Sequence, residues 1–205
     1  KVIASYLRQL LRNDLQYAPF RMEGMEQDVR EMMEIDTPQG KLALQIGGTI
    51  DRLDSKGDTL RIVDYKTGGT PKTPENIEQL FTPADNRPNY IFQTFLYAAI
   101  LCRKQSLKVA PSLLYIHRAA SESYSPVIEM GAPRPTQGTG QSTSAFFEDE
   151  FRERLHGLLQ EIFSQEETFS KQRIPGNVNI AISAVCVRDK KTDHPFIRNR
   201  WSARP

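Results

Sequence analysis

Two apolar runs separated by a short polar tetrad constrain the fold of this chain more than any other feature. Residues 41–54 and 59–67 are both rich in Leu, Ile and Val, and the tetrad Ser-Lys-Gly-Asp at 55–58 lies between them. A glycine-containing turn sequence between two such runs is typical of a β-hairpin. We therefore predict two antiparallel strands at 41–54 and 59–67.

The length of the turn decides which side chains of this hairpin meet. A loop of two or of four residues pairs Leu53 with Leu60. Because side chains of a strand alternate between its faces, Asp51, Asp64 and Lys66 then share one face. The two carboxylates lie diagonally to each other, about 7–8 Å apart at the backbone. A loop of three residues would turn one strand over and separate the acids.

The predicted face is difficult to neutralise with protein groups alone. Two carboxylates among leucine and isoleucine side chains are costly unless positive charge lies between them, and Lys66 offsets only one. A divalent cation would offset the rest, since Mg²⁺ binds proteins through one or two carboxylates. The alternative is a solvated strand face on which Asp64 and Lys66 form a weak exposed pair.

The remaining segments predict helices around a sheet. Apolar residues recur at helical spacing over 2–17 and 145–168. We also expect an extended segment at 20–34, helices at 74–81 (with Thr73 as N-cap) and 89–103, strands at 113–117 and 124–130, and a loop at 131–144. This order predicts an α/β fold with a central mixed β-sheet flanked by helices.

Composition limits the classes of function to consider. The 205 residues predict one domain (1–205), with a loosely ordered basic tail at 185–205. A net charge of +2 does not by itself indicate nucleic-acid binding. The longest apolar run, residues 96–102, is too short to cross a bilayer, so we expect no membrane association and a cytoplasmic location. Because the chain starts at Lys1, we expect it to be the C-terminal part of a longer polypeptide.

Three short sequences occur in the order found in one nuclease superfamily. Gly-x-x-Asp51-Arg-x-Asp precedes Val-Asp64-Tyr-Lys66-Thr-Gly, and Gln93-Thr-Phe-Leu-Tyr97 follows. Together they resemble the PD-(D/E)XK nucleases, and most of all the RecB-like branch that includes the nuclease domains of the RecB and AddB helicase–nucleases. The resemblance implies a restriction-endonuclease-like core.

The same resemblance implies roles for the residues of the hairpin. Asp51 and Asp64 would bind Mg²⁺ or Mn²⁺ together with the backbone carbonyl of Tyr65. Lys66 would be the catalytic lysine, positioning or deprotonating a water or stabilising negative charge. The implied reaction is metal-dependent, exonuclease-like hydrolysis of DNA phosphodiester bonds in repair or recombination. The implied partners are DNA and a helicase region, in the same chain or in a partner subunit.

Three residues outside the hairpin would support this site or its substrate. Gln93 and Tyr97 are four residues apart, so both side chains lie on one face of the predicted helix. Glu26 occupies a position ahead of the hairpin where relatives often carry a glutamate. A buried amide and a core tyrosine are the alternative interpretation of the Gln93 and Tyr97 pair.

Two departures from the RecB-like pattern bear on activity. Many members complete the metal site with a His or Glu from a preceding helix, whereas residues 2–17 offer only Asp14. AddB-type relatives hold an iron–sulfur cluster with four cysteines, and this chain has only Cys102 and Cys186, so we predict no iron–sulfur cluster.

A second hypothesis is therefore a catalytically inactive DNA-binding or scaffolding module with the nuclease fold. A third is a hydrolase of another phosphodiester.

Overall fold

The computed structural model describes residues 2–38, 40–83, 88–104, 108–121, 123–130, 143–163 and 185–187, without the side chains of 143–147 and 185–187. In chain order the elements are α1 (Val2–Tyr17), β1 (Arg21–Thr37), β2 (Gly40–Lys56), β3 (Thr59–Lys66), α2 (Glu78–Phe81), α3 (Asn89–Cys102), β4 (Lys108–Tyr115), the 3₁₀ helix η1 (Ile116–Arg118), α4 (Thr143–Phe163) and β5 (Val185–Val187). The alternation of helices and strands confirms the predicted α/β fold.

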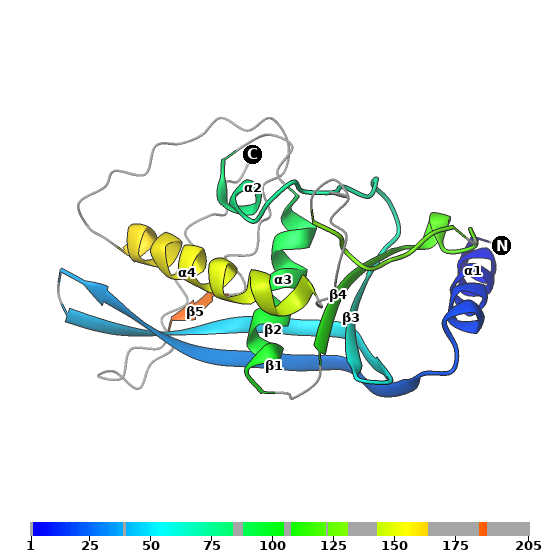
Figure 1. Cartoon of the computed structure of the whole chain (residues 1–205), viewed down its shortest axis with the longest axis horizontal. Coiled ribbons are helices and arrows are strands. Elements are labelled where there is room, and N and C mark those ends of the chain that lie inside the picture. The colour runs from blue at the N-terminus through cyan, green and yellow to red at the C-terminus, as the bar shows by residue number, and fades with distance from the viewer. Residues whose placement is uncertain are drawn as a thin grey trace, which may run out of the picture.

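The strands form one mixed sheet in the order β1-β2-β3-β4 (Figure 1). The β1–β2 and β2–β3 pairs are antiparallel, as the hairpin pattern predicts, and β5 adds an antiparallel pair to β2. The β3–β4 pair is parallel. A parallel pair needs a long crossover connection, and here that connection contains α2 and α3.

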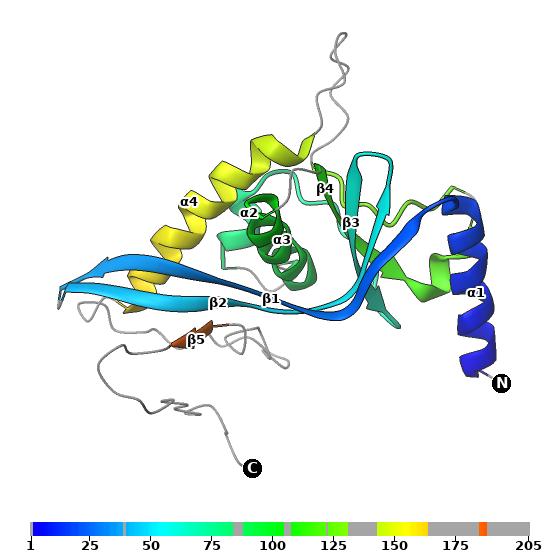
Figure 2. The same cartoon turned by 90° about the horizontal axis from the view of Figure 1, so that it is seen from below.

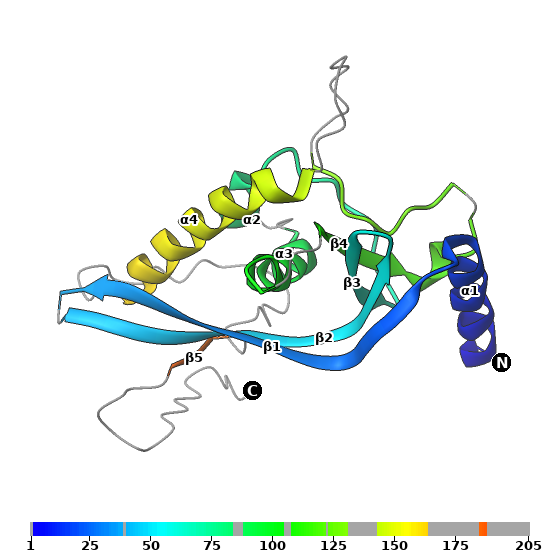
Figure 3. The ribbon, with the colours of Figure 1, turned by 60° about the horizontal axis from the view of Figure 1, so that its bottom comes forward.

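One face of the sheet carries the main hydrophobic core. Figures 2 and 3 show α2, α3 and α4 together on one side of the β1–β2 ribbon. Helix α3 is apolar on most of its circumference and is buried from Ile91 to Leu101 apart from Phe92 and Gln93, which are half-buried. Aromatic rings bring α2, α3 and α4 together: the ring centroids of Phe81, Phe92 and Phe151 lie 5.2–5.4 Å from one another.

The opposite face carries a smaller core under α1. Val63, Leu114, Ile116 and Ala119 are buried there, and side chains of α1 such as Leu10 pack against them. Figure 1 shows α1 at one end of the molecule, far from the tip of the β1–β2 ribbon. The other apolar side chains that predict this helix are largely exposed: Ile3, Leu7, Leu11 and Leu15.

The predicted strand at 124–130 is wrong. In the described residues the segment forms an isolated antiparallel bridge between Val127 and Ser112, made by two backbone hydrogen bonds of 2.9 Å, from Leu113 N–H to the Pro126 carbonyl and from Ile128 N–H to the Pro111 carbonyl. Prolines have no N–H, so Pro111 and Pro126 prevent a longer ladder.

The predicted helix at 74–81 is shorter in the structure. Only Glu78–Phe81 is helical, and Thr73 does not cap it. The Asn76 side chain instead accepts a hydrogen bond of 3.0 Å from the Gln79 backbone N–H.

Parts of three other predictions lie outside the described residues. These are most of the loop at 131–144, the end of the helix at 145–168, and residues 188–205 of the basic tail. Residues 185–187 of that tail form β5, which was not predicted. Among the described residues, no helix combines the length and apolar character needed to span a bilayer.

Candidate metal centre

The β2–β3 hairpin closes one residue later than the sequence predicts. Its loop is formed by residues 57–58, and Leu53 lies opposite Ile62 instead of Leu60. Gly57 has a φ of +61°, and a positive φ at the first loop position is what a type II′ turn requires. The predicted register is therefore wrong by two residues. Because two is also the period of a strand, each side chain keeps its predicted face.

The two acids meet where this ladder ends. Arg52 and Val63 are the last paired residues of β2 and β3, and the same register continued by one residue sets Asp51 opposite Asp64. Asp51 therefore lies directly opposite Asp64, whereas the predicted register places the two acids diagonally to each other. Oδ2 of Asp51 accepts a hydrogen bond of 2.9 Å from the backbone N–H of Tyr65, which fixes this acid against β3.

Asp64 has a buried oxygen that lacks a directed hydrogen bond. The Lys66 ammonium lies 2.5 Å from Oδ2 of Asp64, and the two side chains are only 16% and 11% exposed. Within the described part of the chain, this oxygen nevertheless has no hydrogen-bond partner of good geometry. The contact is an ion pair without a well-aligned hydrogen bond, so Oδ2 can still bind a further positive group.

The electrostatics of this face favour an additional cation. Burial raises the pKa of Asp64 above its ordinary value; the nearby Lys66 ammonium opposes that rise, and the charge of Asp51 adds to it. Ionised Asp64 is thus held in an environment that penalises its charge. A positive ion at the carboxylate would relieve this penalty.

Gln93 and Tyr97 lie together on the side of α3 that faces the acids. The Gln93 side-chain amide donates a hydrogen bond of 2.9 Å to the Tyr97 hydroxyl. Burial raises the pKa of Tyr97, and the charges of Asp64 and Asp51 raise it further, which puts the hydroxyl within electrostatic reach of both acids. A Cβ on Gly48 would lie 2.4 Å from this hydroxyl, so glycine is needed for the tyrosine to approach β2.

Glu26 lies near the acid pair in the sheet but does not contact it. Met25 pairs with Arg52 and Gln27 with Ile50, which leaves Glu26 beside the Asp51 position. Glu26 is exposed and has a φ of 48°, an uncommon value for a residue other than glycine. No hydrogen bond or ion pair joins it to the acids in the described residues, and its supporting role stays a prediction.

The donor set fits a hard divalent cation with few protein ligands. The described residues contain no group of three or more His, Cys, Asp or Glu side chains arranged to hold a metal. Asp51 and Asp64 supply two carboxylates, and the unsatisfied Oδ2 of Asp64 is the kind of oxygen that a metal would bind. Mg²⁺ commonly uses only one or two carboxylates and completes its shell with water and substrate phosphate.

The cysteines do not add to this donor set. Cys102 lies on α3 beside the main core, and burial, together with Glu148, raises the pKa of its thiol to about 12. Cys186 lies in β5, where the backbone pairs with Gln45. The prediction that the chain binds no iron–sulfur cluster stays a prediction.

Sequence reasoning missed Tyr90. The Lys66 ammonium lies 4.0 Å from the centroid of its ring. Tyr90 is three residues before Gln93 and seven before Tyr97, and this spacing puts all three on one side of a helix. That spacing is the signal that could have identified it.

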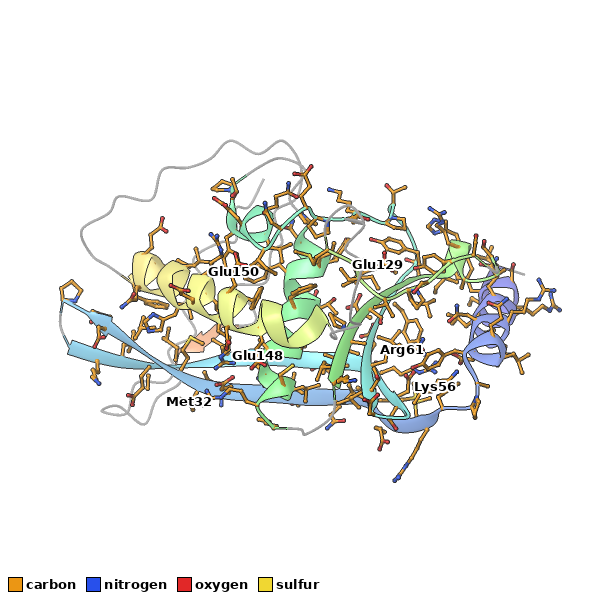
Figure 4. The ribbon with its side chains drawn as sticks, viewed as in Figure 1. Met32, Lys56, Arg61, Glu129, Glu148 and Glu150 are labelled. Carbon is orange, nitrogen blue, oxygen red and sulfur yellow. The ribbon has the colours of Figure 1, made fainter. Side chains whose placement is uncertain are left out.

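The reverse face of the hairpin holds a second group of charges. Arg61 binds Asp54 through two hydrogen bonds of 2.9 and 2.8 Å, and Arg52 lies 2.9 Å from the same carboxylate. Arg52 also donates to both carboxylate oxygens of Asp14 on α1, at 3.0 and 2.9 Å. Figure 4 shows Arg61 and Lys56 between the hairpin and α1. Asp14 is therefore part of this network and lies on the face away from Asp51.

Comparison with known proteins gives one match. A family model described as the PD-(D/E)XK nuclease superfamily matches residues 1–175. The matched range contains every residue of the site described above. No curated protein and no solved structure matches the chain.

Proposed function

The chain belongs to the PD-(D/E)XK nuclease superfamily, and from that premise we propose that it is a metal-dependent deoxyribonuclease. The observation that carries the proposal is the incompletely satisfied acid pair: Asp51 and Asp64 lie opposite each other at the end of the β2–β3 ladder, and the buried Oδ2 of Asp64 has an ion pair with Lys66 but no directed hydrogen bond among the described residues. Structural charges are normally paired and hydrogen-bonded when buried. A buried acid left short of positive charge is better explained by an ion that binds there.

The carboxylates of Asp51 and Asp64 and the carbonyl of Tyr65 would hold Mg²⁺ or Mn²⁺, the ions that nucleases of this superfamily generally use. When bound, such an ion supplies a lowered pKa for a coordinated water and positive charge for the phosphoryl oxygens. The backbone N–H of Tyr65 donates a hydrogen bond to Asp51 and so keeps this carboxylate oriented. The backbone carbonyl of Tyr65 lies on the same strand, β3.

The chain's own residues contribute positioning and charge. The Lys66 ammonium lies beside Asp64, where it can orient a water toward phosphorus or stabilise negative charge in the transition state. Gln93 and Tyr97 close the α3 side of the site. The Tyr97 hydroxyl, held by Gln93, is aimed at the strand that carries Asp51.

A narrower proposal is that the chain belongs to the RecB-like branch of the superfamily. It is supported by the order of the three short sequences and by α3, which brings Gln93 and Tyr97 to the face that carries the acids. On this assignment the enzyme acts as an exonuclease on DNA in repair or recombination. It would work in the cytoplasm beside a helicase region of the same chain or of a partner subunit.

A cleavage assay with matched variants tests the proposal. Labelled single- and double-stranded DNA is incubated with Mg²⁺ or Mn²⁺ and the native chain, Asp64→Ala or Lys66→Ala. We expect each variant to lose about 10²- to 10⁴-fold in rate, the usual contribution of a residue that acts at the reacting centre. Circular DNA as a second substrate separates exonuclease from endonuclease action.

The exposed ion pair of Asp58 and Lys108, 2.8 Å apart, provides the control. Asp58 lies in the β2–β3 loop and Lys108 is the first residue of β4. Asp58→Ala and Lys108→Ala make the same chemical changes away from the acid pair, and these variants should cut DNA like the native chain. Equal cleavage by all five proteins would show that the assigned site is wrong.

A second candidate is a DNA-binding module without turnover. It is favoured by the absence of a third metal-binding side chain among the described residues. Such a module would bind DNA with an affinity that falls as salt increases, yet would leave the DNA intact at all metal concentrations.

A further inference from the structure

Helix α3 presents one side to the acid face of the hairpin, and Tyr90 is the first residue on it. Tyr90, Gln93 and Tyr97 follow one another at helical spacing. Gln93 and Tyr97 bind each other near β2, whereas the ring of Tyr90 lies 4.0 Å from the Lys66 ammonium. The three side chains thus reach different parts of one site.

Tyr90 does not contribute to the hydrophobic core. Its side chain is 52% exposed, although most of α3 beyond it is buried. Its backbone is firmly held, because the hydroxyl of the buried Thr94 donates a hydrogen bond of 2.8 Å to the Tyr90 carbonyl. The observation to explain is therefore the contact of this exposed ring with the Lys66 ammonium.

Lys66 needs a second contact in order to stay in place. A lysine side chain is long and flexible, and its single ion pair with Asp64 lacks good hydrogen-bond geometry. Asp64 Oδ2 is also the oxygen that a divalent cation would bind, so an ammonium held only by that oxygen would compete with the cation. The face of an aromatic ring attracts an ammonium without using a carboxylate oxygen.

We propose that Tyr90 is a positioning residue whose ring holds the Lys66 ammonium beside Asp64, including when the carboxylate binds a cation. The proposal rests on the proposed function in so far as Lys66 acts in catalysis. Tyr115 lies on the same side, since it pairs with Lys66 in the β3–β4 ladder. Tyr115 is buried, however, and only Tyr90 is recorded in contact with the ammonium among the described aromatic rings.

Steady-state kinetics test this role. Tyr90→Leu removes the aromatic face, and the cation–π contact predicts a fall in kcat of about 2- to 30-fold with KM changed by less than about twofold. Tyr90→Phe keeps the ring and should restore kcat to within about twofold of the native value. A Tyr90→Leu enzyme with native kcat, or one in which only KM rises, would overturn the proposal; the second result would identify Tyr90 as a substrate contact.

A spectroscopic readout tests the contact without relying on catalysis. Lysine labelled with ¹³C at Cε gives one signal per side chain, and Lys66→Arg identifies the Lys66 signal by its loss. We expect the Lys66 signal to show a ring-current shift in the native chain and in Tyr90→Phe. In Tyr90→Leu we expect the signal to remain and the ring-current shift to be absent. Lys56, whose ammonium lies 4.8 Å from the Tyr17 ring, is an internal control that Tyr90→Leu should not affect.

The two readouts separate failure of this inference from failure of the proposed function. If the native chain shows no ring-current shift at Lys66, Tyr90 does not hold the lysine, whatever the chain cleaves. If the shift is present and depends on the ring but no DNA is cut with either metal, the proposed function fails while the positioning of Lys66 by Tyr90 stands.

Discussion

The two faces of the β2–β3 hairpin carry similar charged residues in opposite states of neutralisation. On the α1 side, the two guanidinium groups of Arg52 and Arg61 meet two carboxylates, those of Asp54 and Asp14, at 2.8–3.0 Å, although Nε and Nη2 of Arg52 have no directed hydrogen bond among the described residues. Asp54 is fully buried there. On the α3 side, within the described residues, Lys66 pairs with Asp64, Asp51 accepts a hydrogen bond from the Tyr65 N–H, and Oδ2 of Asp64 has no well-directed hydrogen bond.

This difference in charge balance is the basis on which we assign different roles to the two groups of charges. On the α1 side, burial alone would lower the pKa of Arg52, yet hydrogen bonds to Asp14 and Tyr65 raise it above its ordinary value. The Tyr17 ring also covers Arg61 at 3.6 Å. Those charges stabilise each other, whereas the charge of Asp64 is penalised where it lies. We therefore infer a structural role for the first group and propose the second as a site for a cation.

The largest expected loss of stability comes from a substitution that breaks the network on the α1 side. Arg61→Ala leaves buried Asp54 without its bidentate partner and should lower the free energy of unfolding by about 3–5 kcal/mol, measured by urea denaturation. Arg21→Ala, which removes a largely exposed arginine 3.7 Å from Glu23, is the matched control and should cost less than about 1 kcal/mol.

A double variant sharpens this result. Replacing the pair by apolar residues, Asp54→Leu with Arg61→Met, should recover part of the lost stability because both charges of the pair are removed together and Arg52, which loses Asp54, keeps its contacts with Asp14. If Arg61→Ala were no more destabilising than Arg21→Ala, the α1-side network would not be structural and the contrast between the faces would fail.

A smaller loss of stability is expected when an added methyl group crowds the α3 side. Gly48→Ala places a methyl group 2.4 Å from the Tyr97 hydroxyl, which must move, and should lower the free energy of unfolding by about 1–3 kcal/mol. In Gly68→Ala the new methyl group has open space, so this control should have little effect. A Gly48→Ala protein as stable as the control would show that Tyr97 does not pack against β2.

The smallest effect is a gain in stability from removing an acid. Burial raises the pKa of Asp64, so the folded state binds this proton more tightly than the unfolded state. The stabilising proton is fully bound below the ordinary pKa of an aspartate and is lost as pH rises through the raised value. In chelator, Asp64→Asn should therefore have a higher Tm than the native chain at neutral pH, and the difference should shrink in acid.

Asp28 provides a control of opposite sign. Hydrogen bonds from Thr49 and Arg30 lower its pKa, so its contribution is present above the ordinary aspartate pKa and is lost as pH falls through the lowered value. Asp28→Asn should lower Tm at neutral pH. A lower Tm for Asp64→Asn at neutral pH would mean that the α3-side acid is as well neutralised as the α1-side acids.

The sequence predicted which face each hairpin residue occupies but could not predict the register. Alternation in a strand follows from backbone geometry, and the two-residue error left it unchanged. The choice of loop was open because the tetrad 55–58 is compatible with more than one turn. Gly57 decides it, since its position at the first loop residue sets Asp51 directly opposite Asp64.

Contacts that depend on the packing of distant elements were beyond the sequence pattern. Asp14 was considered only for the metal site, and its pairing with Arg52 depends on α1 docking against the far face of the sheet. The contact of Tyr90 with Lys66 likewise depends on how α3 crosses β3. Local spacing predicts the face of an element but not the partner that it meets.

Direct measurement of cation binding tests the central claim. Free Mn²⁺ is followed by electron paramagnetic resonance as it is titrated into the native chain, Asp51→Asn, Asp64→Asn and the exposed-site control Asp58→Asn. The account predicts saturable binding by the native chain and the control, weakened by more than about tenfold in the other two variants. Equal binding by all four proteins, or no saturable binding by the native chain, would contradict it.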